Sequence, residues 1–272
     1  VEAWKKQREE SDRLKRLITP RMSIRDFVAI YNQLSLYHLA SVIFLGGHRG
    51  TRLERLTFPL LFSSREFVAI SDKESTEYSA YRVLPRFASL DAILEAHLSL
   101  LRALSNRIER HDRKLGKRLA DISFGKRKNC PLFFSLNEKG KTWEPVPIRT
   151  EHLATYFRDN FGAARNFGRH FWLSQLIENA VPRMLARFFL GHARRGMEPH
   201  GSAAGVSVRI ACEAIGPALA SIAADFGFKD LPPRRAENGR AARVPFSFPR
   251  TLAKLGSMFV EDYIAALDIS GH

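Results

Sequence analysis

The sequence predicts a mostly α-helical fold with small β-hairpins, an α+β class. Several segments repeat apolar residues every three or four positions, which is the spacing of amphipathic helices. Strand-like runs are short, rich in β-branched and aromatic residues, and separated by polar turns. The 272 residues are 45% apolar and 26% charged, a composition that can bury a sizeable core and excludes a disordered or collagen-like chain.

The first third of the chain contains a predicted helix followed by a hairpin. Ser23 and Asp26 are typical of an N-terminal capping pair, and apolar residues then recur at helical spacing up to the two glycines at 46–47. Two β-like runs, 67–70 and 81–84, lie on either side of a polar turn. We therefore expect a long helix and one β-hairpin in this part.

The middle of the chain alternates helical and irregular segments. Residues 90–108 carry apolar side chains at helical spacing and predict a long amphipathic helix. Residues 112–130 are basic and poor in apolar side chains, so we expect them to form a connection. The apolar run 131–136 leads into a turn, after which Thr150 is a candidate cap for the next helix. Another helical stretch is expected over about 170–177.

The last part of the chain is predicted to contain three more helices. The first covers about 181–190 and ends at Gly191, a typical C-terminal stop. The second is marked by apolar positions over 208–226, and the third lies near 251–267. Between these two, residues 231–243 are rich in Pro, Arg, Asn and Gly and predict a loop.

Domain organisation and compartment follow from composition. We expect residues 23–272 to form one domain and residues 1–22 to be a charged linker or the end of another domain. No apolar run reaches the roughly 18 residues of a membrane span, so no membrane partner is expected. Cys130 and Cys212 are too few for a zinc site and suit reduced thiols in a cytoplasmic protein. We expect neither a metal nor a cofactor.

The charge of the chain points to a polyanionic partner. It carries 43 Lys and Arg against 28 Asp and Glu, giving a formal net charge of +15 and a pI near 10.3. The basic residues recur in three clusters, over 5–16, 102–128 and 234–243. Any one cluster is typical of a soluble basic surface, but three together favour DNA or RNA as the partner.

Four short segments are candidates for chemistry when they are taken together. They are Gly46-Gly47-His48-Arg49, Ile70-Ser71-Asp72-Lys73, Asn166-Phe167-Gly168-Arg169-His170 and Leu190-Gly191-His192. Taken alone, each has a simple structural interpretation, such as a turn lysine or a capping histidine. In this order and spacing they resemble the catalytic domain of the tyrosine recombinases, the phage-integrase superfamily, over about residues 23–200. The resemblance implies that residues 1–22 are the end of an N-terminal DNA-binding domain and that the protein works in a bacterial cytoplasm or nucleoid.

The resemblance implies a role for each matching side chain. Arg49 and Arg169 would clamp the non-bridging oxygens of a DNA phosphate, as planar guanidinium groups do without a metal. Lys73 would protonate the leaving 5′ oxygen, and His192 would hydrogen-bond a phosphate oxygen or assist proton transfer. Asn166 occupies the position where the family motif begins with histidine.

The sequence departs from the family at the nucleophile. Arg52 stands where an acidic residue is usual, and no tyrosine follows the Leu-Gly-His segment within 193–206. Tyr263 is the only later tyrosine and could serve as a displaced nucleophile. Binding without strand cleavage is therefore slightly favoured over catalysis.

The predicted function is sequence-specific binding of double-stranded DNA by a degenerate tyrosine-recombinase-like protein of a mobile element, acting as a target-site selector. The alternative is an active site-specific recombinase, and an RNA-binding or structural basic protein is a third possibility. Other transposition proteins or further copies of the chain are expected partners. The candidate DNA-binding residues are Arg52, Arg194, Arg195, Lys114, Lys117 and Arg118.

Overall fold

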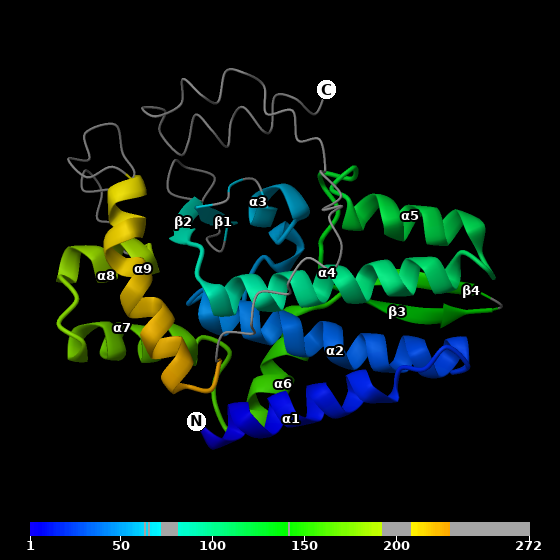
Figure 1. Ribbon diagram of the computed structural model, residues 1–272, viewed down its shortest axis with the longest axis horizontal. Coiled ribbons are helices and arrows are strands. Elements are labelled where there is room, and N and C mark those ends of the chain that lie inside the picture. The colour runs from blue at the N-terminus through cyan, green and yellow to red at the C-terminus, as the bar shows by residue number, and fades with distance from the viewer. Residues whose placement is uncertain (63, 65, 72–80, 141, 192–207, 229–272) are drawn as a thin grey trace, which may run out of the picture.

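The computed structural model (Figure 1) describes residues 1–62, 64, 66–71, 81–140, 142–191 and 208–228. The fold in this part is mostly helical with two small antiparallel β-hairpins, as the sequence predicts. The elements, in chain order, are α1 (Glu2–Leu17), α2 (Ile24–Leu45), η1 (Leu53–Arg55), α3 (Phe58–Phe62), β1 (Phe67–Ser71), β2 (Tyr81–Pro85), α4 (Ala88–Ile108), α5 (Arg113–Ser123), β3 (Phe134–Lys139), β4 (Thr142–Pro147), α6 (Thr150–Phe161), α7 (Phe167–Glu178), α8 (Arg183–Leu190) and α9 (Val208–Asp225).

Helix α2 is the central element of the core. Ser23 caps it by accepting a hydrogen bond from the backbone N–H of Asp26 at 3.1 Å, which confirms the predicted start. Helices α1, α4, α6 and α7 and strand β3 all contact it. By length and mean hydropathy α2 does qualify as a membrane span, contrary to the sequence expectation, yet 78% of its most apolar window is buried within the fold.

Residues 1–22, expected as a linker or the end of another domain, contribute helix α1, which contacts α2 and α6. The contact depends on Trp4, which is 4% exposed. Its ring centroid lies 4.8 Å from that of Phe44 on α2 and 4.3 Å from that of Phe161 on α6. Burial of this indole anchors the otherwise charged helix.

The two hairpins contact different helices, because β3 packs against α2, whereas β1 contacts α3 and β2 contacts α8 and α9. Strands β1 and β2 form the predicted antiparallel hairpin, in which Phe67 lies opposite Pro85. Their connecting turn lies outside the described residues. Strands β3 and β4 pair with Phe134 opposite Pro147. The apolar run before β3 was predicted, but β4 was not, because Thr142–Pro147 contains two prolines and no buried residue.

Helix α5 corrects the prediction that residues 112–130 are only a connection. Asp112 caps it, accepting a hydrogen bond from the backbone N–H of Leu115 at 2.9 Å. Leu115, Leu119 and Ile122 form a buried stripe at helical spacing. Gly116 lets α5 approach α4, because a Cβ at this position would lie 2.5 Å from the Cα of Glu109. The abundance of basic side chains obscured this narrow stripe.

Replacing Gly116 by alanine is expected to lower the free energy of unfolding by about 1–2 kcal/mol. The added methyl group meets the backbone of Glu109, and moving α5 away would open the contact with α4. Urea unfolding of the full chain measures the change. Ala103→Gly, at an exposed site on α4, is the matched control and reports helix propensity alone, about 1 kcal/mol. A gain in stability for Gly116→Ala would contradict the steric argument.

The helices of the C-terminal half occur where the sequence predicts them, but some begin or end at other residues. Helix α6 begins at Thr150 itself, with Arg149 at the cap position, one residue earlier than predicted. Helix α8 ends at Gly191, whose φ of 62° is the left-handed conformation that glycine favours. Helix α9 covers the predicted range. The loop at 231–243 and the helix at 251–267 lie outside the described residues.

Candidate functional site

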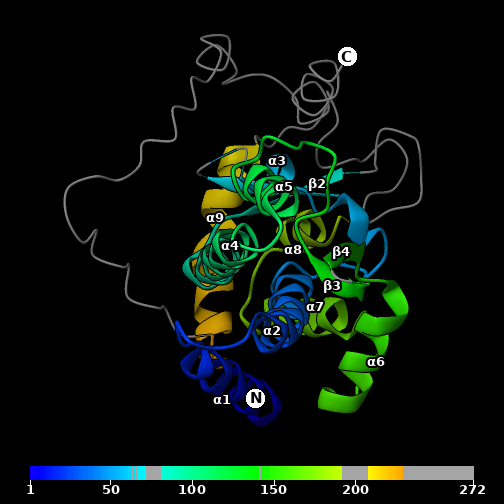
Figure 2. The same ribbon diagram turned by 90° about the vertical axis from the view of Figure 1, so that its right-hand side faces the viewer.

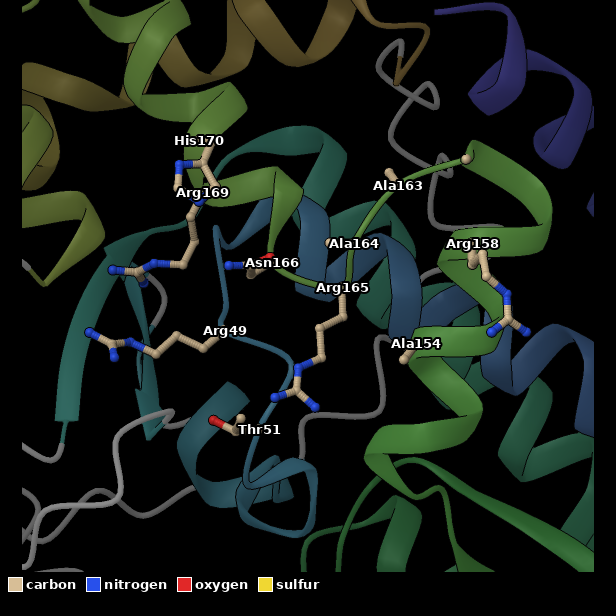
Figure 3. A pocket seen from close by; sticks show the side chains of 11 residues that line it. Arg49, Thr51, Ala154, Arg158, Ala163, Ala164, Arg165, Asn166, Arg169 and His170 are labelled. Atoms are coloured by element: carbon tan, nitrogen blue, oxygen red, sulfur yellow. The ribbon is translucent and has the colours of Figure 1, made fainter.

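A cleft of about 960 Å³ opens between the segment that follows α2 and the turn that joins α6 to α7 (Figure 3). It has charged, amide and small side chains on its walls. The lining residues are Arg49, Thr51, Ala154, Arg158, Gly162, Ala163, Ala164, Arg165, Asn166, Arg169 and His170.

The first wall is built by the turn at the end of α2. Gly47 has φ of 52°, and a Cβ on it would press on Phe189 and Leu190 of α8 at 3.2 Å. His48 is buried, and its Nδ1 accepts a hydrogen bond from the backbone N–H of Gly50 at 2.9 Å. With the histidine turned inward, the next side chain, Arg49, is exposed at the cleft.

The second wall is the turn from α6 into α7. Helix α6 ends at Gly162, and α7 starts after Asn166, whose side chain makes no capping bond. Asn166, Arg169 and His170 all line the cleft, so the N-terminal turn of α7 borders it. The side chain of Arg165 lies 3.4 Å from the Cβ position of Gly50, which joins the two walls. A helix N-terminus adds a positive partial charge and favours anions.

Two buried arginines hold these walls to α8. Arg169 is 7% exposed and donates hydrogen bonds to the carbonyl oxygens of Gly47, at 3.1 Å, and Leu190, at 2.6 Å. Arg82 on β2 is 1% exposed and donates to the carbonyls of Gly46 and Gly47 from one nitrogen, at 2.8 and 2.9 Å. Its other terminal nitrogen donates to Phe189 at 2.6 Å. The C-terminal ends of α2 and α8 are thereby tied together.

The charge lining the cleft is of one sign. Four of the eleven lining side chains are arginines, and none is Asp or Glu. In Figure 3 the side chains of Arg49 and Arg169 extend toward the same side, while Arg165 points toward Thr51. Arg158, on the opposite side, also pairs with Asp159 at 3.0 Å on an exposed surface. Such a set of planar cations suits phosphate or another multivalent anion.

The structure brings together three of the predicted site residues, since Arg49, Asn166 and Arg169 line the same cleft. Arg52 follows the cleft segment with φ of 54° and lies 3.8 Å from the carboxylate of Glu54. Three predicted DNA-binding residues, Lys114, Lys117 and Arg118, are exposed on α5, away from the cleft lining. The remaining predicted residues lie outside the described part of the chain: Lys73, His192, Arg194, Arg195 and Tyr263.

Sequence reasoning missed three arginines of this region. Arg165 directly precedes Asn166, and Arg158 lies two turns earlier on α6, so the helix and turn prediction could have placed them near the motif. Arg82 is recognisable in another way, because it is a charged residue inside the apolar strand run 81–84. Arginine is rarely fully buried without partners, so that position predicts a structural guanidinium.

Within the described residues, no group of three His, Cys, Asp or Glu side chains lies close enough to hold a metal ion. Cys130 and Cys212 are free thiols. Comparisons of the chain with protein-family models, curated proteins and solved structures give no match.

Proposed function

We propose that the protein binds double-stranded DNA at a preferred site through a fold like the tyrosine-recombinase catalytic domain, and that it selects target sites for a mobile element. The observation that carries this proposal is the cleft, with four arginines and no carboxylate on its walls. A phosphodiester carries a negative charge on two non-bridging oxygens, and guanidinium forks match that geometry. The net charge of +15 favours the same partner at long range.

The order of the motif residues supports the recombinase-like form of this proposal. Arg49 and Arg169 lie about 120 positions apart in the chain, yet both line the cleft with Asn166. The clustering follows from contacts of α2 with α7 and of α7 with α8. Arg169 donates two hydrogen bonds to carbonyl groups, which fixes the orientation of its guanidinium and holds the segment that carries Arg49.

Removing two cleft arginines, the exposed Arg49 and the half-buried Arg165, tests the DNA-binding proposal. We expect Arg49→Ala with Arg165→Ala to weaken binding of a mixed-sequence 30-base-pair duplex by about 100-fold, roughly tenfold for each charged contact. The slope of log K against log salt should fall by about 1.8, close to 0.9 for each phosphate contact. Fluorescence anisotropy over a range of salt concentrations measures both quantities.

The matched control removes two arginines from another surface. Arg13 and Arg25 have side chains that are 60% and 75% exposed and pair with Glu10 and Glu138. Helix α2 spans 22 residues, about 33 Å, so Arg25 at its start lies far from the cleft at its end. Arg13→Ala with Arg25→Ala should leave the salt slope within error of wild type. Equal losses in the two double variants would contradict a DNA site in the cleft.

Site preference and cleavage need separate experiments. Selection from a pool of random duplexes should enrich one sequence, and failure to enrich any would remove site selection from the proposal. A nicked duplex carrying that sequence is then tested for a detergent-resistant protein–DNA adduct. Tight binding with no adduct supports the target selector. An adduct that disappears in Tyr263→Phe would instead identify an active recombinase.

A further inference from the structure

Helix α5 carries a second basic surface that the cleft does not include. Its apolar stripe packs inward, while Arg113, Lys114, Lys117 and Arg118 are exposed on the outer side. Within the described part of the chain, Arg113, Lys114 and Lys117 form no ion pair. An unpaired row of cations on one helix face is available to an external anion.

The basic surface continues into the segment after α5. Lys126 and Arg127 are exposed there, and Lys126 lies 3.9 Å from Asp121, the single acidic residue between 113 and 130. We give the name α5 patch to six of the exposed cations of the helix and this segment. Its members are Arg113, Lys114, Lys117, Arg118, Lys126 and Arg127.

Contacts with η1 and α3 connect the α5 patch to the cleft side of the molecule. The backbone N–H of Leu132 donates to the carbonyl of Leu56 at 2.8 Å, and Thr57 forms a β-bridge with Pro131. Gly125 lies so close to Phe58 that a Cβ there would be 2.4 Å from the ring. Because η1 and α3 directly follow the segment that carries Arg49, the patch and the cleft rim are joined by packed structure.

The position of α5 in the fold agrees with these contacts. In Figure 1 and Figure 2, α3 and α5 both lie in the upper part of the described fold, and α1 lies at the bottom. An 11-residue helix is about 16 Å long, which corresponds to about five base pairs of B-DNA. One face of α5 can therefore meet several phosphates of a single duplex.

The side chains of the α5 patch favour duplex backbone over single strands. Single-stranded DNA and RNA are held by several aromatic side chains on which bases stack. Phe124 is the one aromatic residue among the large exposed apolar side chains of the described residues. The guanidinium of Arg102 lies over its ring at 5.2 Å, so one face is already covered. Every member of the patch is Arg or Lys, residue types that commonly contact phosphate oxygens.

We infer that the α5 patch is a second DNA-contact surface, which binds the sugar–phosphate backbone of the same duplex beyond the segment held in the cleft. This inference rests on the proposed function. The cleft and the α5 patch then have different roles. Phosphate contacts at the patch add affinity and fix the orientation of the duplex without reading its sequence. The α5 patch should therefore matter for long duplexes and not for short ones.

The test replaces Lys114, Lys117 and Arg118 by glutamine together and compares a 30-base-pair duplex with a 10-base-pair duplex. For the long duplex, the slope of log K against log salt should fall by about 2.7, near 0.9 for each lost contact. For the short duplex, the slope should stay close to that of wild type. Lys126→Gln with Arg127→Gln provides an independent variant with the same expected pattern.

The matched control removes three exposed cations from α1, with Lys6→Gln, Lys15→Gln and Arg16→Gln, and should bind both duplexes as wild type does. Wild-type binding by the patch variants, together with weak binding by the cleft double variant, would overturn this inference and leave the proposed function standing. Equal losses on both duplex lengths, or a preference of the patch for single-stranded DNA or RNA, would also overturn it. Failure of the wild-type chain to bind any duplex would overturn both proposals.

Discussion

Replacing Arg82 by methionine should lower the free energy of unfolding by about 3–5 kcal/mol. The guanidinium is almost fully buried and donates three hydrogen bonds of 2.6 to 2.9 Å to carbonyl oxygens of Gly46, Gly47 and Phe189. Methionine fills a similar length of apolar space, so the loss isolates the missing donors. Three carbonyl groups at two helix ends would lose their charged partner, and each such bond contributes about 1.5–3 kcal/mol.

Urea unfolding followed by circular dichroism measures the effect of Arg82→Met. The matched control is Arg25→Met, which removes an exposed guanidinium that pairs with Glu138 at 2.7 Å. Exposed pairs contribute little, so that variant should lose less than about 1 kcal/mol. Similar losses in the two variants would contradict the structural role of Arg82.

The conservative substitution Arg82→Lys separates charge from geometry. A lysine retains the positive charge but has one ammonium group, which cannot bridge the ends of α2 and α8 as the planar fork does. We therefore expect an intermediate loss of stability, of about 2 kcal/mol. Because Gly47 accepts from both Arg82 and Arg169, loosening this junction also displaces the segment that presents Arg49.

The helices that the sequence predicted well are those with local stop signals and wide apolar faces. Helix α2 has its Ser23 cap and terminal glycines, and α8 ends at Gly191, as expected. Helix α5 was missed because Leu115, Leu119 and Ile122 are separated by cations that dominate the composition. Its stability depends on packing against α4 through Gly116, and such a tertiary contact is not visible in local sequence.

Those parts of the candidate site that come from short stretches of sequence could be predicted. Asn166 and Arg169 lie in one short motif, and the turn after α2 placed Arg49 by the same reasoning. Arg82 was beyond such reasoning, because its acceptors lie about 36 and 107 residues away in the chain. Its role emerges only once β2 is seen between the ends of α2 and α8.

The core of the protein also contains two histidines that should make it sensitive to acid. His38 on α2 and His97 on α4 are 1% and 0% exposed, with ring centroids 5.6 Å apart. Burial lowers the pKa of His97 to about 4, opposed by its hydrogen bond with the carbonyl of Leu132. Burial, and then the charge of His97, lower the pKa of His38 well below its usual value.

The direction of the pH dependence follows from these shifts. Both histidines are neutral in the folded protein, whereas in the unfolded chain they take up protons below about pH 6.5. The free energy of unfolding is therefore highest above about pH 6.5 and decreases as the pH falls toward 4, because the unfolded chain binds protons that the folded protein does not. His97 alone accounts for roughly 3 kcal/mol over this window, about 1.4 kcal/mol for each pH unit. Urea unfolding at pH 7.5, 6 and 5 should show the decline.

Replacing His38 by leucine should flatten this decline. Neither ring nitrogen of His38 has a hydrogen-bond partner among the described residues, so an apolar side chain of similar size removes a buried polar group at little steric cost. We expect higher stability at pH 5 and a slope smaller by about 1.4 kcal/mol per pH unit. His152→Leu, at an exposed position on α6, is the matched control. Of the two replaced histidines, only His38 occupies a buried site that disfavours its protonated form. If stability depends on pH identically in the two variants, the acid sensitivity arises elsewhere.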